Sequence, residues 1–253
     1  MSLKILPVLL FAAFLFTSCS HVYTPALYHQ DIAYQPKPAS FDSVKVANYV
    51  SAGLNLYSNT DLSDALTSGQ LNLSRAYVFK GYNLSYGAFG VAGDYSNTGS
   101  KTSPDYFSDK FFGALGARAS ADLYVTSVRF DIRYIGFEAA YSHEFGSYAD
   151  FRQSIQSSPN FDVDPRTNLF TLGLTSEVIF HNTGNSNFQN GIRGFLGTTF
   201  GRYDLDDSYL LNASSSSFLH KVFPKASYFI KIKNYFGTVE VGSEFFIRLG
   251  LQF

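Results

Sequence analysis

Residues capable of acid–base or nucleophilic chemistry are few in this chain, and their spacing does not suit them to it. The five histidines, which show no metal-ligand spacing, are His21, His29, His143, His181 and His220. A nucleophile, a base and an acid could be sought in Ser142, His143 and Glu144. Because neighbouring residues of a strand point to opposite faces, Ser142 and His143 cannot converge there.

Carboxylates gather in two polar segments. They are Asp204, Asp206 and Asp207 in one segment, and Asp162 and Asp164 in the other. Such oxygens could bind Ca²⁺ or bridge to lipopolysaccharide through cations, but solvated loop residues are the preferred interpretation. There is no glycine-rich phosphate loop or paired-cysteine motif, and the net charge of −1 gives no field to attract nucleic acid. The sequence thus predicts no catalytic residue, no metal, no cofactor and no nucleic-acid partner.

An export signal is indicated at the start of the chain. Lys4 precedes an apolar run from Ile5 to Phe16, and small residues follow it. This arrangement is typical of a secretory signal peptide. Twelve apolar residues make about 18 Å of helix, too short for a hydrocarbon core of about 30 Å.

Cys19, the only cysteine, stands directly after this segment. The segment resembles the lipobox of bacterial lipoproteins, although Phe16 occupies the place where that family prefers Leu. The resemblance implies removal of residues 1–18 and acylation of Cys19, with palmitate as an expected acyl group. An ordinary cleaved signal with a chance cysteine, or an uncleaved buried helix, are the alternatives.

The remainder of the chain has the composition of a β protein. Aromatic residues reach 17% without any Trp, charged residues are only 15%, and 20 glycines occur. Aromatic and β-branched side chains suit a pleated surface. Residues 19–43 are polar, irregular and carry Pro25, Pro36 and Pro38, so they are interpreted as a lipidated tether.

From residue 44 to 253, apolar and polar residues alternate in segments that end in Gly, Asn, Asp or Ser clusters. In one segment the phase of the alternation slips near Tyr134, which fits a β-bulge. The expected strands are 44–57, 69–79, 82–95, 110–124, 128–146, 167–181, 191–203, 218–233, 236–242 and 245–253. Ten strands fit this segmentation, and eight remain possible if residues 218–253 divide differently.

The connections between these strands mostly alternate between long and short, which is the habit of bacterial outer-membrane barrels. We therefore expect an all-β fold: an antiparallel, up-and-down transmembrane β-barrel. A soluble, lipid-tethered β-sandwich is the main alternative. An anchor on the periplasmic side, with the C-terminus on the same side, would require an even strand count.

The C-terminal residues resemble the closing strand of outer-membrane barrels, which is read by the barrel-assembly machinery. The residues that carry this resemblance are Phe245, Ile247, Leu249, Gly250, Leu251 and Phe253. If the apolar faces look outward, charged residues of both signs face the lumen: Glu138, Glu177, Arg193, Lys231, Glu240 and Arg248. Because an unpaired charge there would be costly, we expect these residues to form an interior network of salt bridges.

These features predict a non-enzymatic outer-membrane lipoprotein with a structural or interaction role in the envelope of a Gram-negative cell. It would display loops or serve as an accessory subunit. Its expected partners are outer-membrane lipids, the barrel-assembly machinery and an envelope protein complex. The alternatives are an outer-membrane enzyme acting on lipid or peptide, and a soluble tethered β-domain that binds a ligand.

Overall fold

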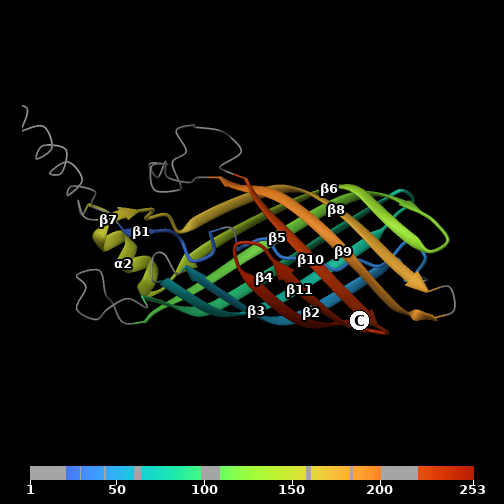
Figure 1. The fold of residues 1–253 in the computed structure, drawn as a ribbon, viewed down its shortest axis with the longest axis horizontal. Helices are drawn as coiled ribbons and strands as arrows, with labels where there is room; N and C mark the ends of the chain where they lie inside the picture. Colours follow the sequence, from blue (N-terminus) through green and yellow to red (C-terminus); the bar gives the residue numbers. More distant parts are fainter. Residues whose placement is uncertain are drawn as a thin grey trace, which may run out of the picture.

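The computed structural model describes residues 21–28, 30–42, 44–59, 64–97, 109–157, 161–182, 185–200 and 222–253. Ten of its strands form a closed barrel in the order β10-β11-β12-β2-β3-β4-β5-β6-β8-β9, with every neighbouring pair antiparallel (Figure 1). They are β2 (Val46–Asn59), β3 (Asp64–Val78), β4 (Tyr82–Asn97), β5 (Lys110–Thr126), β6 (Phe130–Phe145), β8 (Asn168–Asn182), β9 (Asn185–Phe200), β10 (Phe223–Ile232), β11 (Tyr235–Val241) and β12 (Phe245–Gln252). The expected ten-stranded antiparallel barrel is confirmed.

The polarity of the barrel wall is opposite to that of a soluble protein. In β12, Phe245, Ile247 and Leu249 are exposed on the outside, whereas Phe246 and Arg248 are buried inside. The same alternation recurs around the barrel, so large apolar side chains cover the exterior and polar ones face the lumen. An apolar exterior with a polar interior is the arrangement of a membrane-spanning barrel.

The wall contains the irregularity that the sequence predicts. Between Arg133 and Gly136 the pairing of β6 with β8 shifts in register, which brackets Tyr134. A second shift, between Leu123 and Tyr124, interrupts the pairing of β5 with β6. Tyr134 is the extra residue of this bulge in β6. Because it shifts the alternation by one position, the apolar side chains beyond the bulge still face the exterior.

The two ends of the barrel differ. At one end, called here the turn end, three-residue and two-residue connections join β3 to β4, β5 to β6 and β10 to β11. At the other, the loop end, the connection from β6 to β8 contains helix α2 (Ser147–Ile155) and strand β7 (Phe161–Val163). The sequence pattern predicted only a loop for this connection. The helix forms because tertiary packing supports it: the Tyr148 ring is buried and stacks on Tyr95, with ring centroids 4.1 Å apart.

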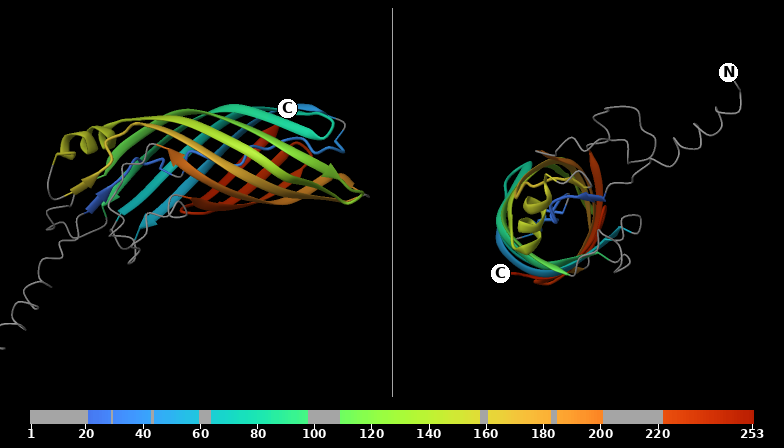
Figure 2. Two further views of the ribbon diagram at one scale, coloured as in Figure 1. Left: turned by 90° about the horizontal axis from the view of Figure 1, so that it is seen from above. Right: turned by 90° about the vertical axis from the view of Figure 1, so that its left-hand side faces the viewer.

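The segment expected to be a tether does not hang outside the barrel. Strand β1 (His21–Tyr23) lies at the loop end, and the chain then runs inside the barrel before β2 begins (Figure 2). From Tyr23 to Ala39, the residues whose exposure is described are buried except Thr24 and Tyr28. Residues 23–42, called here the lumen segment, therefore belong to the interior of the fold, and the tether interpretation of these residues is wrong.

Glycines on the inner wall make room for interior rings. Gly173 and Gly197 are paired across β8 and β9, and a Cβ built on either would overlap the ring of Phe195. We expect Gly197→Val to lower the free energy of unfolding by about 1–3 kcal/mol, since the Phe195 ring and the Leu172 carbonyl would have to shift. Gly194→Val is the matched control, because nothing lies within 4 Å of a Cβ there. The thermal midpoint of heat-modifiable gel migration measures the effect; equal midpoints for the two variants would contradict the packing described.

Candidate functional site: the occupied lumen

The lumen segment enters the barrel through an ordered cap at the loop end. Strand β1 pairs in parallel with β7, and the Asp164 amide donates a hydrogen bond of 2.9 Å to the Tyr23 carbonyl. The Tyr148 hydroxyl of α2 donates to the Thr24 carbonyl at 2.9 Å. Backbone pairing with β7 and a side-chain hydrogen bond from α2 therefore fix the start of the segment.

A buried ion pair lies directly beneath this cap. Arg152 of α2 donates to Glu144 at 2.5 Å, and it also donates to the Asp164 carbonyl at 2.5 Å. The other oxygen of Glu144 accepts the backbone amide of Ala26 at 2.7 Å. One carboxylate of the wall thus joins the helix to the lumen segment, and the arginine side chain is completely buried.

Apolar side chains fill the space around this entrance. They come from the lumen segment, the cap and the loop-end halves of the wall strands, and they include Tyr23, Leu27, Leu66, Phe89, Val91, Tyr95, Phe112, Tyr148, Val163 and Leu169. All of them are buried and form one cluster. Burial of this much apolar surface drives water out of the loop end of the lumen.

Tyr34 is the central contact point of the lumen segment. Its backbone amide donates to both oxygens of Glu240, at 3.1 and 3.0 Å, and its carbonyl accepts from Arg248. Its hydroxyl donates to Glu177 at 2.8 Å. Its ring stacks on Phe229, with centroids 5.2 Å apart and planes at 15°. The wall therefore satisfies the backbone and the side chain of this one residue from β8, β10, β11 and β12.

Ion pairs surround Tyr34 on the inner wall. Glu240 accepts from Arg248 at 2.9 Å and lies 3.9 Å from Arg193. Arg193 also pairs with Glu138, and Arg133 pairs with Glu177. These charged side chains are all buried. Because buried charges are tolerated only when they are paired and hydrogen-bonded, the network ties the lumen segment to the barrel wall.

The lumen segment leaves the barrel at the turn end through a second set of polar contacts. Lys37 forms an ion pair with Asp122, and the Ser40 amide donates to Asp131 at 2.7 Å. Asp42 accepts from Lys231 at 3.2 Å and from Gln189 at 2.7 Å. Both ends of the segment are thus attached to wall strands, as is its middle.

The structure brings together five of the six charged residues that the sequence placed in the lumen. Glu138, Glu177, Arg193, Glu240 and Arg248 lie around Tyr34, whereas Lys231 lies near the turn end, with 15% of its side chain exposed. Other charged residues, which were not assigned to the lumen from sequence, are also buried in the interior: Asp31, Lys37, Arg118, Asp122, Arg133, Glu144, Arg152 and Lys225. The period of two could have identified Arg118 and Asp122, which share a face of the expected strand 110–124.

The other residues considered from sequence lie outside this network. Ser142 is buried and His143 is exposed, so they occupy opposite faces of β6. Asp164 is buried in the cap, where it pairs with Arg166 at 3.5 Å. Cys19, His29, Asp204, Asp206, Asp207 and His220 lie outside the described residues, as do the side chains of His21, Asp162 and His181. Across the described part of the chain, no group of three His, Cys, Asp or Glu residues could hold a metal ion.

The C-terminal residues lie as a closing strand requires. β12 pairs with β11 on one side and with β2 on the other, which closes the barrel. Phe245, Ile247, Leu249 and Phe253 are exposed and Leu251 is half-buried on the same outer face, while Gly250 lies where the Phe236 ring approaches from inside.

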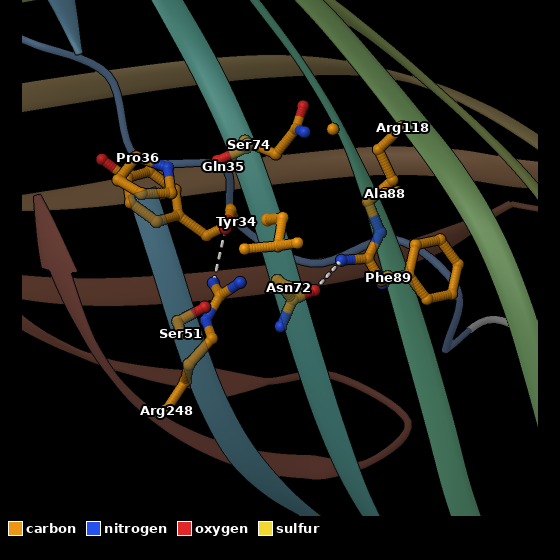
Figure 3. A pocket seen from close by; sticks show the side chains of 12 residues that line it. Tyr34, Gln35, Pro36, Ser51, Asn72, Ser74, Ala88, Phe89, Arg118 and Arg248 are labelled. Carbon is orange, nitrogen blue, oxygen red and sulfur yellow. Dashed lines mark hydrogen bonds between the residues drawn. The ribbon is translucent and has the colours of Figure 1, made fainter. Parts of the chain in front are cut away.

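A small pocket lies between the lumen segment and the wall, lined by Tyr34, Gln35, Asn72, Arg118 and Arg248 among others (Figure 3). Its volume is about 10 Å³, which is about the space of one water molecule. Two of the lining residues are joined directly, because Arg118 donates to the Asn72 side-chain oxygen at 2.6 Å. Sites for organic ligands usually have several hundred Å³, far more than this pocket has.

The closed wall, the apolar exterior and the occupied lumen define the class: a membrane-spanning β-barrel of the bacterial outer-membrane kind. Within the described residues, no helix is long and apolar enough to cross a membrane. No protein-family model matches the sequence, and no curated protein resembles it in sequence.

Several solved structures resemble the chain in fold. Neisserial surface protein A shares 10% identity at a TM-score of 0.36, over 82% of this chain and 97% of its own. The NanC porin shares 11% identity at a TM-score of 0.37, over 82% of this chain and 99% of its own. OprG of Pseudomonas aeruginosa shares 13% identity at a TM-score of 0.34, over 83% of this chain and 97% of its own. OprG is an outer-membrane protein and NanC is a porin, but at TM-scores this low the likeness transfers no function to this chain.

Proposed function

We propose that this chain is a non-enzymatic outer-membrane lipoprotein whose closed barrel has a structural or interaction role in the cell envelope. The observation that carries the proposal is the occupied lumen. A barrel that conducts solutes needs a water-filled path, whereas here a chain segment with buried ion pairs fills the interior. Ser142 and His143, the nucleophile and base considered from sequence, lie on opposite faces of β6, which favours a role in presentation over chemistry.

The loop end is the surface that such a protein would present. There α2, β1 and β7 form an ordered cap, which is fixed to the barrel through Arg152 and Glu144. The outward side of α2 carries exposed polar residues, including Asp150, Gln153 and Ser154. Since a rigid scaffold presents its surface loops at little entropic cost, this cap is suited to contact an envelope partner.

The remaining proposed partners follow from the wall and the termini. The apolar exterior suits the acyl chains of outer-membrane lipids, and the exposed alternation in β12 suits recognition by the barrel-assembly machinery. Acylation of Cys19 would add a lipid anchor to a barrel that is already held by its own exterior.

The purified full-length protein, inserted in a planar lipid bilayer, tests the closed lumen. We expect no stable ohmic conductance above the bilayer background, because the lumen segment and its ion pairs leave no continuous aqueous path. A conducting porin inserted in the same bilayer serves as the positive control. A reproducible single-channel conductance from the intact, folded protein would contradict the proposed function.

A further inference from the structure

We propose that the mature N-terminus of this protein lies on the outer side of the membrane, at the loop end, and that the acyl chains of Cys19 insert into the outer leaflet. This inference depends on the proposed outer-membrane location. From the sequence, the anchor was expected on the periplasmic side. The structure points to the opposite side, because the lumen segment already crosses the membrane before β2, the first strand of the barrel, crosses it again.

The direction of the lumen segment follows from its contacts with a single strand. β5 runs from the loop end at Lys110 to the turn end at Thr126. The Asp31 carbonyl accepts from Arg118 at 2.5 Å, Lys37 pairs with Asp122, and the Ser40 hydroxyl lies 2.6 Å from that of Thr126. As residue numbers in the segment increase, its partners move steadily toward the turn end.

Strand β8 gives the same direction independently. It also runs from the loop end, at Asn168, to the turn end, at Asn182. Thr171 donates to the Asp31 carboxylate at 2.8 Å, whereas Glu177, farther along, accepts from the Tyr34 hydroxyl at 2.8 Å. The segment therefore starts at the loop end and finishes at the turn end, where Val46 begins β2.

The membrane sides of the two ends follow from the architecture. In bacterial outer-membrane barrels the short turns face the periplasm and the long connections face the exterior. The turn end also carries the closing residues of the chain, since the Phe253 amide donates to Asn48, near the start of β2. Strand β1 lies at the opposite end, paired with β7. His21 is thus on the exterior side.

The segment is long enough for this crossing, and Cys19 is close to its start. About twenty residues in extended form reach roughly 65 Å, against a hydrocarbon core of about 30 Å. Cys19 precedes His21 by only two residues, which span at most about 7 Å. An acyl group on Cys19 is therefore held at the exterior side and cannot reach the periplasmic leaflet while the lumen segment stays in place.

Three epitope insertions into the full-length chain test this placement by antibody binding to intact and permeabilised cells. One epitope stands between Ser20 and His21, a second follows Gln156 at the loop end, and a third separates Lys233 from Asn234 at the turn end. We expect the first two to be detected on intact cells at similar levels, and the third only after permeabilisation. Heat-modifiable migration shows that each variant is folded.

The controls separate failure of this inference from failure of the proposed function. If the Gln156 epitope is detected on intact cells and the His21 epitope only after permeabilisation, the N-terminus is periplasmic and the inference is wrong. If the Gln156 epitope itself is hidden, the outer-membrane placement fails. A His21→Cys variant, labelled with a membrane-impermeant maleimide of high mass, repeats the test without an insertion; absence of labelling on intact cells would overturn the inference.

Discussion

Replacing residues 30–38 of the lumen segment with glycine and serine is expected to convert a non-conducting barrel into one with measurable, fluctuating conductance. The replacement keeps the loop-end cap and the exit contacts of Ser40 and Asp42 with the turn end, but it removes Asp31, Tyr34 and Lys37. Water would then enter the middle of the lumen, because the wall charges there lose their interior partners. Planar bilayer recording of the variant beside the intact protein measures the change.

The interpretation of this experiment requires a folded variant and a control for the substitution itself. Heat-modifiable migration shows whether the barrel has formed. The control is Gln153→Gly combined with Ser154→Gly, on the exposed side of α2. These substitutions add flexible residues without changing the lumen, so we expect no conductance from this variant. If the folded lumen variant conducted no more than the intact protein, the lumen segment would not be what blocks the barrel.

Replacing Glu240 with alanine is expected to lower the free energy of unfolding by about 3–5 kcal/mol, the usual cost of breaking a buried ion pair by removing one partner. Glu240 accepts from Arg248, from Ser227 and from the backbone amide of Tyr34, and it lies near Arg193. Without it the buried Arg248 guanidinium loses its carboxylate partner, and the buried amide of Tyr34 loses its acceptor. The urea midpoint of folding into detergent micelles or lipid vesicles measures the loss.

Asp150→Ala is the matched control for Glu240→Ala, because it removes a carboxylate that is exposed on α2. Its expected effect is within about 0.5 kcal/mol, as is usual for surface substitutions. Glu240→Gln should fall between the two, since the amide oxygen can still accept a hydrogen bond while the charge is lost. If Glu240→Ala were no less stable than the Asp150 variant, the interior network would not hold the fold together.

The barrel itself could be predicted from sequence because its signal is local. A period of two repeats along each strand, and in β12 the alternation of Phe245, Ile247 and Leu249 with Arg248 shows which face meets lipid. The inward position of Glu240 and Arg248 followed from the same alternation. Their pairing did not, since it depends on register between β11 and β12 and on contacts with a residue more than two hundred positions earlier.

The lumen segment could not be predicted because it has no repeating pattern of its own. Pro25, Pro36 and Pro38 lack backbone donors, and the irregular polarity is that of a linker. Its amides are satisfied by carboxylates of the wall, as Glu144, Glu240 and Asp131 illustrate, and such partners leave no trace in the local sequence. One indirect signal was available: eight strands suffice for side chains to fill a barrel, so ten strands leave space for another element.

Hydrogen exchange of the folded protein, followed by mass spectrometry, tests most directly that residues 23–42 occupy the lumen. We expect peptides covering residues 30–42 to exchange as slowly as those from β5 and β8, because residues 30–39 are buried and the amides of Tyr34 and Ser40 are bonded to wall carboxylates. Peptides from the exposed end of α2 give the fast reference. Exchange of residues 30–42 at that fast rate, in a barrel whose strands remain protected, would show that this segment does not occupy the lumen.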